Sequence, residues 1–145
     1  AAAFASDSVD AWSIWDPFLA LAEARQPVRL LTTTADTIAV NTYLLANKTF
    51  AGANPAIVTK TIAGLGDTAD WANTHRGDVA AALTEITGVP SGPQTVAVER
   101  AVYGILPLTD EIIAGQQVTA DRFFKLGLIP KPITVSDAVW SAPKA

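Results

Sequence analysis

The sequence predicts an α/β protein that is rich in helices and contains a few short strands. Short runs of extended character at residues 9–14, 28–31 and 41–46 predict the strands. Apolar residues that recur at helical spacing through most of the chain after residue 54 predict the helices. Turn and cap residues separate the two kinds of pattern, so we expect several helices joined by a few extended segments.

The first predicted strand covers residues 9–14, where aromatic and β-branched side chains alternate with others. Asp16 followed by Pro17 ends this strand, because the pair is typical of a helix N-terminus. The carboxylate can accept hydrogen bonds from the free N–H groups of the first turn, and the proline ring presets φ. A helix is therefore expected from Pro17 to about Ala24, with Asp16 as its N-cap.

The later elements follow from their spacing and from their end signals. Pro27 breaks the first helix before the strand at residues 28–31, and Tyr43 shares one face of the strand at residues 41–46 with Leu45. Residues 103–107 form a short extended piece, and prolines keep the tail irregular apart from one turn capped by Ser136. The helices are expected at residues 55–75, 78–87, 91–100 and 109–127, with Gly88 and Gly127 as C-terminal glycines.

The composition excludes several kinds of site. A net charge of −4 and a pI near 4.8, without a basic cluster, argue against nucleic acid and anionic membranes as partners. The chain has no cysteine, which excludes thiolate catalysis, disulfides and Cys-ligated metals. His75 is the only histidine, and its place at a helix end beside Arg76 favours a structural role. We therefore expect no catalytic residue, no metal site and no cofactor.

The beginning of the chain is unusual. Residues 1–4 read as the end of an apolar helix without a cap, and the chain contains no methionine. No apolar run approaches the length of about 18 residues typical of a transmembrane helix, and no basic and apolar leader is present. The mature form of a secreted protein would look the same. We expect a fragment, or one chain of a split protein.

The run at residues 9–18 (VDAWSIWDPF) resembles the corresponding segment of the substrate-binding proteins of ABC importers for aliphatic sulfonates. These proteins are related to the taurine and nitrate binders. Further matches follow in that family's order: residues 41–50 (NTYLLANKTF), Asn54-Pro55, residues 70–73, Tyr103-Gly104, Pro107-Leu108, Gln116-Gln117, residues 126–130 and residues 137–140. No single motif is diagnostic, but colinearity over about 130 residues is much more specific than any one of them.

The resemblance implies the C-terminal half of a two-lobed periplasmic-binding-protein fold of type II, because family members are about twice as long. Residues 1–40 would complete the second lobe as strand, helix and strand. Residues 41–145 would return through a hinge strand, around residues 40–42, into a mostly helical first lobe. The implied function is to bind a small anionic organosulfonate between the lobes and to deliver it to an ABC permease, without a reaction. The implied location is periplasmic or extracytoplasmic, including attachment as a lipoprotein through an N-terminal part that is absent here.

By the same resemblance the ligand-binding residues are Trp15, Asp16, Trp12, Asn41, Thr42 and Tyr43. Trp15 is the main candidate, because a flat apolar ring can cover an alkyl chain and leave the sulfonate oxygens to hydrogen-bond donors. Its alternative role is packing in a core. Trp12 is expected on the same face unless Ser13 bends the strand, and packing is again its alternative.

Asp16 has two alternative roles. As an N-cap it points into the helix turn, whereas related binders of amino-bearing ligands use an acid at this corner to hold the ammonium group. A carboxylate that faces a sulfonate would repel it, so the second role requires a ligand with a compensating cation. Asn41, Thr42 and Tyr43 offer amide and hydroxyl donors beside the expected hinge, although such groups are also common on plain surfaces.

Two other functions remain open. An enzyme on the same two-lobed fold, of the kind that makes thiamin-pyrimidine or menaquinone precursors, would need a general acid or base, or a consumed side chain, in its cleft. A truncated module would bind nothing, because half of the cleft is missing. Half of such a fold would also leave strand edges and an apolar face uncovered. The missing N-terminal half or a second copy of the chain is therefore an expected partner.

Overall fold

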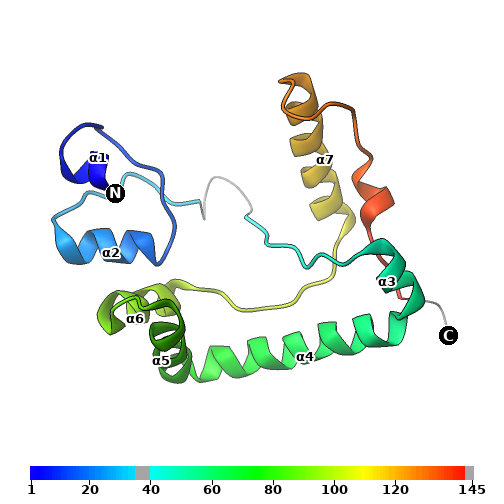
Figure 1. Ribbon diagram of the computed structural model, residues 1–145, viewed down its shortest axis with the longest axis horizontal. Coiled ribbons are helices and arrows are strands. Elements are labelled where there is room, and N and C mark those ends of the chain that lie inside the picture. Colours follow the sequence, from blue (N-terminus) through cyan, green and yellow to red (C-terminus); the bar gives the residue numbers. More distant parts are fainter. Residues whose placement is uncertain (35–39, 143–145) are drawn as a thin grey trace. The chain divides into compact units, whose positions relative to one another are not determined.

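The computed structural model describes residues 1–34 and 40–142 of the chain (Figure 1). In these two ranges all regular structure is helical. The elements are α1 (Ala2–Ala5), α2 (Phe18–Arg25), α3 (Lys48–Ala53), α4 (Pro55–Thr74), α5 (Arg76–Thr87), α6 (Ser91–Arg100), α7 (Asp110–Lys125) and the 3₁₀ turn η1 (Val135–Ala138). None of these helices combines the length and the apolar composition that crossing a bilayer requires.

The predicted strands are not formed in the described part of the chain. Residues 9–14, 28–31 and 41–46 have irregular backbone without strand pairing, and so do residues 103–107. A strand is stable only when a neighbouring strand completes its ladder of hydrogen bonds, and no described segment pairs with these four. The expected few short strands are therefore not confirmed, whereas the expected richness in helices is.

The predicted helices begin and end close to their expected positions, because the signals for helix ends are local. α2 begins one residue after Pro17, and α5 ends directly before Gly88, whose φ of 72° is left-handed. At the start of α7 the side chain of Thr109 accepts the N–H of Ile112 at 3.3 Å. Gly127, also with a φ of 72°, follows the end of α7.

α3 is a helix that the sequence pattern does not predict. The side chain of Asn47 accepts the N–H of Phe50 at 3.0 Å and caps this helix of six residues. The helix is too short to display a helical period, and it includes Gly52, which lowers helix propensity. The cap is therefore the only local signal for it.

Contacts divide the chain into two compact units. The first unit is Ala1–Leu44 with Asp67–Tyr103, and the second is Leu45–Gly66 with Gly104–Ala145. The lobe boundary expected after residue 40 refers to a whole two-lobed protein, and residues 35–39 beside it lie outside the described residues. That boundary therefore stays a prediction.

In the first unit α6 packs against both α2 and α5 (Figure 1). The buried apolar side chains of these helices are small, namely Ala20 of α2, Ala80 of α5, and Ala97 and Val98 of α6, and the amide side chain of Gln94 in α6 is buried as well. Small side chains let helix backbones approach each other closely. α6 thus connects the N-terminal part of this unit to α5.

In the second unit α7 packs against η1 (Figure 1). Gln117 of α7 holds the tail, because its Nε2 donates to the carbonyl oxygen of Ile133 at 2.9 Å and its Oε1 accepts the N–H of Val135 at 2.8 Å. The same Nε2 donates to Asp121 at 2.7 Å. A single amide side chain therefore fastens the irregular tail to the long helix.

Apolar side chains remain widely exposed. Among the described residues no large side chain is fully buried. Leu45, Val102 and Leu106 are 87%, 96% and 78% exposed, and all three lie in or directly beside segments that the sequence predicts as extended. Exposed apolar surface of this extent is typical of an interface with further polypeptide.

Candidate ligand-binding corner

The candidate site is the turn by which the chain enters α2, and we call residues 12–18 the aromatic corner. Asp16 Oδ1 accepts the N–H of Ala20 at 3.0 Å, as expected for a carboxylate at a helix start. Pro17 occupies the N-cap position, so Asp16 lies one residue before the expected cap. The predicted helix-capping contact of Asp16 is therefore present in a slightly different geometry.

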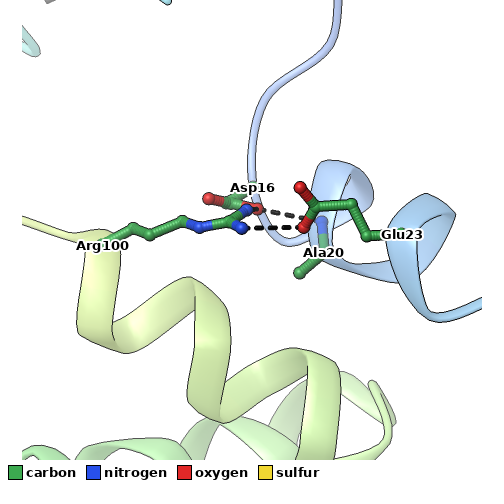
Figure 2. A network of polar contacts seen from close by, with 4 residues as sticks. All are labelled: Asp16, Ala20, Glu23 and Arg100. Atoms are coloured by element: carbon green, nitrogen blue, oxygen red, sulfur yellow. Dashed lines mark hydrogen bonds and ion pairs between the residues drawn. The ribbon is translucent and has the colours of Figure 1, made fainter. Parts of the chain in front are cut away.

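Asp16 also faces a cation from a distant part of the sequence. Figure 2 shows the guanidinium of Arg100, the last residue of α6, reaching Asp16 and Glu23 of the N-terminal segment. Arg100 Nη1 lies 3.5 Å from Asp16 Oδ1, and Nη2 donates to Glu23 Oε2 at 2.8 Å. These two ion pairs join the aromatic corner and α2 to α6.

The electrostatics of this cluster keep Arg100 charged. The hydrogen bond to Glu23 raises the pKa of Arg100 above its ordinary value, and the negative charges of Glu23 and Asp16 act in the same direction, while partial burial opposes them. The side chains of Asp16, Glu23 and Arg100 are 23%, 30% and 42% exposed. The cluster is thus only partly shielded from water, which weakens each ion pair.

The two tryptophans of the corner have different neighbours. The Trp12 ring is half-buried and lies 6.0 Å from the Phe4 ring, whereas the Trp15 ring is 70% exposed and meets Phe18 edge-on at 6.3 Å. The shared face was expected of a regular strand, and residues 9–14 have irregular backbone, so that expectation stays a prediction.

A hollow of about 340 Å³ lies beside the corner, between α1 and α2. Its lining is mainly apolar and includes Phe4, Trp12, Phe18 and Leu21, with Arg25 as the ionisable side chain. Trp12 therefore lines a concave surface, while Trp15 projects beside it. Both positions are compatible with contact to a small ligand that has an apolar part.

Asn41, Thr42 and Tyr43 lie in irregular backbone of the first unit. Asn41 and Thr42 are exposed, and Tyr43 is half-buried. The hydrogen bond, ion pair and ring contacts described above for the aromatic corner are made by other segments. Their role in ligand binding stays a prediction.

His75 has the surroundings of a structural residue. It is the N-cap residue of α5, its Nδ1 hydrogen-bonds to the carbonyl oxygen of Trp71 at 2.9 Å, and its ring stacks on that indole at 4.7 Å. The adjacent Arg76 donates to the carbonyl oxygens of Val98 and Ala101 at the end of α6. These contacts fix the end of α6, from which Arg100 projects.

Arg100 contacts the aromatic corner, and the sequence alone did not identify this contact. It lies 84 positions after Asp16, so no local sequence pattern could indicate that the two residues pair. The sequence feature that could have indicated such a contact is the presence of two acidic residues, Asp16 and Glu23, close together around the start of α2. A partly buried pair of carboxylates needs a cation, but its position becomes clear only from the packing of α2 on α6.

Comparison with known proteins identifies relatives of the chain, although no family model matches it. A protein of Escherichia coli (strain K12) named as an aliphatic sulfonates-binding protein is 30% identical over 140 residues. A protein of Bacillus subtilis (strain 168) with the same name is 29% identical over 144 residues. The alignments cover 96% of this chain in both cases, but only 44% and 42% of the relatives. The chain thus spans less than half the length of these curated relatives.

Solved structures that match this chain are also sulfonate-binding proteins. The periplasmic aliphatic sulphonate binding protein SsuA from Escherichia coli matches with a TM-score of 0.88 at 30% identity. The alkanesulfonate-binding protein SsuA from Xanthomonas axonopodis pv. citri, bound to MOPS, matches with a TM-score of 0.81 at 29% identity. Each match covers 96% of this chain and 48% of the SsuA chain.

This chain resembles aliphatic sulfonate-binding proteins along almost its whole length. The family resemblance inferred from the motifs is thereby confirmed, and the partial coverage is consistent with the expected C-terminal half. The chain has the fold of the matching part of SsuA. The relatives are named as binding proteins and not as enzymes, which supports the expectation that the chain has no catalytic role.

Proposed function

We propose that the chain is part of an extracytoplasmic solute-binding protein that binds a small organosulfonate and delivers it to an ABC permease. The observation that carries the proposal is the match to SsuA from Escherichia coli, which combines a TM-score of 0.88 with 30% identity over 96% of this chain. A second SsuA is bound to MOPS, a sulfonate whose propyl chain carries a morpholine ring. Attachment as a lipoprotein is the finer part of the proposal and rests on the family resemblance alone.

In this proposal the aromatic corner contacts the organic part of the ligand. Trp15 presents an exposed indole that can cover an alkyl chain, and Trp12 lines the adjacent hollow. Asn41, Thr42 and Tyr43 supply hydroxyl and amide donors to the sulfonate oxygens. A chain with a net charge of −4 and no basic cluster has to hold an anion by such local donors.

The mechanism that we propose is closure of two lobes around the ligand. Contacts from both lobes exist only in the closed form, so the ligand shifts the population toward that form. Residues 1–40 would belong to the second lobe and residues 41–145 to the first, with the hinge around residues 40–42. The permease would then recognise the closed protein.

We also propose that the rest of the binding protein completes the sheet. The segments predicted as strands form no strand ladder among residues 1–34 and 40–142, and they carry exposed apolar side chains, among them Leu31 at 66%, Leu45 at 87% and Leu106 at 78%. Apolar strand segments of this kind are stable when neighbouring strands pair with them and helices cover them. A second polypeptide segment that supplies those neighbours, here the N-terminal half, is therefore the partner that suits these surfaces.

An enzyme on the same two-lobed fold is the rival function. It would require a general acid or base, or a consumed side chain, at the cleft, and Asp16 is the one acid among the proposed site residues. Asp16 is already engaged by the Ala20 N–H and by Arg100, which does not favour proton transfer to a substrate.

The test is a thermal-shift and calorimetry panel of alkanesulfonates, taurine, nitrate and thiamin precursors. The 145-residue chain is measured alone and after co-expression with the N-terminal part of SsuA from Escherichia coli that precedes the matched region. We expect alkanesulfonates to raise the melting temperature of the complemented protein and to be recovered unchanged. Turnover of a thiamin precursor would instead favour the enzyme, and the absence of any shift would favour a module that binds nothing.

A further inference from the structure

Among the described helices, α4 alone belongs to both compact units. Its residues 55–66 fall in the second unit, and its residues 67–74 fall in the first. The chain also passes between the units after Leu44 and after Tyr103, and the backbone at both of these places is irregular. Of the segments that connect the units, α4 is therefore the one with regular structure.

Each end of α4 is held within its own unit. At the start of the helix, the side-chain amide of Asn54 donates to the carbonyl oxygen of Phe50 in α3 at 3.0 Å. At its end, Asn73 Nδ2 donates to the carbonyl oxygen of Tyr103 at 2.8 Å, and the ring of Trp71 stacks on His75. Both ends are thus fixed to neighbouring segments, one in each unit.

No other helix packs against the middle of α4 in the part of the chain that the structure describes. Packing between the described helices joins α5 with α6, α2 with α6 and α7 with η1. Residues 59–71 are exposed or half-buried throughout, and Ala72 is the buried residue of α4. The stability of this stretch therefore depends mainly on its own helix propensity.

Gly64 and Gly66 lie directly before the boundary between the units and lower that propensity, by about fivefold in helix stability for each glycine relative to alanine. Glycine is not required there by the backbone, because the left-handed glycines of the described residues are Gly88 and Gly127. It is not required by space either, since a Cβ at position 64 or 66 would meet no atom within 4 Å. Glycines of this kind make a helix easier to bend.

We propose that α4 is a hinged connector, which bends at Gly64–Gly66 and lets the two units change their orientation while the packing inside each unit stays intact. Hinges are commonly formed by a few residues that absorb a change in backbone angles. The passage after Tyr103 leads directly into another glycine, Gly104, where a Cβ would also meet no atom within 4 Å. This inference goes beyond the proposed function, because it concerns a different segment from the hinge expected around residues 40–42 and does not depend on a ligand.

Spin labels can measure the bending, because the chain has no cysteine that would compete for them. Ala56→Cys and Asp70→Cys place two labels at exposed positions of α4, 14 residues apart and on either side of the glycines. A straight helix would separate these positions by about 21 Å. We expect a broad distribution that extends to shorter distances in the 145-residue chain, and a distribution about half as wide or narrower after Gly64→Ala and Gly66→Ala are added. Dilution with an excess of unlabelled chain removes distances between copies.

The matched control is a label pair at Glu111→Cys and Lys125→Cys, which has the same separation of 14 residues and also encloses a glycine, Gly115. These positions are exposed and lie in α7, which belongs to a single unit and packs against η1. We expect a narrow distribution for this pair, and Gly115→Ala should leave its width unchanged.

Hydrogen exchange of residues 59–70 provides a second measurement that needs no labels. The two alanine substitutions together should slow this exchange by about tenfold or more. Ala63→Gly, at an exposed position of the same stretch, should accelerate it by about fivefold and should broaden the distances between the α4 labels. Neither measurement uses a ligand, so the result is independent of the proposed function.

Three results would overturn the hinge. A distribution for the α4 labels as narrow as that of the α7 labels would show that α4 is rigid despite its glycines. Equal widths with and without the two alanine substitutions would show that the bending does not depend on Gly64 and Gly66. A double alanine variant that no longer folds, with no broadening in Ala63→Gly, would show that the glycines serve close packing and not bending.

Discussion

At the aromatic corner, Asp16 serves the helix and the ion-pair cluster with one oxygen. Its Oδ1 accepts the Ala20 N–H and lies 3.5 Å from Arg100 Nη1. The sequence predicts the first contact, because a carboxylate before Pro17 is a local signal for a helix start. It does not predict the second, which depends on a residue from a different helix.

Trp15 is the residue for which loss of binding and loss of stability should separate most clearly. Its side chain is 70% exposed, so Trp15→Ala should change the free energy of unfolding by no more than about 0.5 kcal/mol. The loss of an indole that covers the alkyl chain should weaken alkanesulfonate binding by about tenfold or more. Urea unfolding and calorimetry on the complemented protein measure the two quantities.

The matched variant for this prediction is Trp15→Phe, which keeps a flat apolar ring beside Phe18 and should retain most of the affinity. If Trp15→Ala destabilises the protein strongly and leaves affinity unchanged, Trp15 is a packing residue in the complete protein and not a ligand contact.

At the level of elements, the longer helices could be predicted, whereas the short helix α3 and the absence of strands among the described residues could not. α5 and α7 form where helical spacing is followed by a glycine, Gly88 or Gly127, and α7 also begins at the capping side chain of Thr109. A strand needs a neighbouring strand that is usually distant in sequence, and in the part of the chain that the structure describes residues 28–31 and 41–46 form no ladder. The sequence pattern predicts these segments as strands, and the structure agrees only in that they are not helical.

The two glycines associated with α7 should respond oppositely to alanine. Gly127 has a φ of 72°, and a Cβ there would meet no atom within 4 Å, so the cost of Gly127→Ala comes from the backbone alone. We expect this variant to lower the free energy of unfolding by about 1 kcal/mol. Gly115→Ala, in the interior of the same helix and equally free of neighbours, should raise it by about 0.5 to 1 kcal/mol.

Urea unfolding followed by circular dichroism measures both variants against the parent chain. A neutral or stabilising effect of Gly127→Ala would contradict the left-handed conformation at that position. It would also imply that α7 continues further toward the tail than residue 125.

The packing of η1 in the C-terminal tail against α7 depends on one side chain, Gln117. Gln117→Ala removes the hydrogen bonds to the Ile133 carbonyl and the Val135 N–H, so η1 should detach from α7. We expect a loss of about 1 to 3 kcal/mol in local stability, seen as faster hydrogen exchange and proteolysis after residue 130.

Thr119→Ala is the control on the same helix, because the Thr119 hydroxyl donates only within α7, to the carbonyl oxygen of Gly115 at 3.3 Å. Equal exchange rates in the parent chain and in Gln117→Ala would mean that contacts other than this amide hold η1.

At the scale of the whole molecule, the exposed apolar surface and the partial match to longer relatives lead to one conclusion. The chain spans 48% of each matching SsuA structure, and its apolar segments at residues 28–31, 41–46 and 102–106 lack the neighbours that a sheet would provide. Exposed apolar segments with free backbone groups pair readily with other chains. The isolated chain should therefore associate, either with a complementary half or with itself.

Light scattering coupled to size-exclusion chromatography tests this conclusion directly. The chain alone should elute as oligomers of the 15.1 kDa protomer and should bind a hydrophobic dye, whereas co-expression with the N-terminal part of SsuA should yield a heterodimer with less dye binding. The heterodimer should also unfold more cooperatively, because pairing of residues 41–46 would convert exposed side chains such as Leu45 into core. A monodisperse 15.1 kDa monomer with a cooperative thermal transition would contradict the prediction. In that case the chain alone would pair and cover the segments predicted as strands, through contacts that are not present among the described residues.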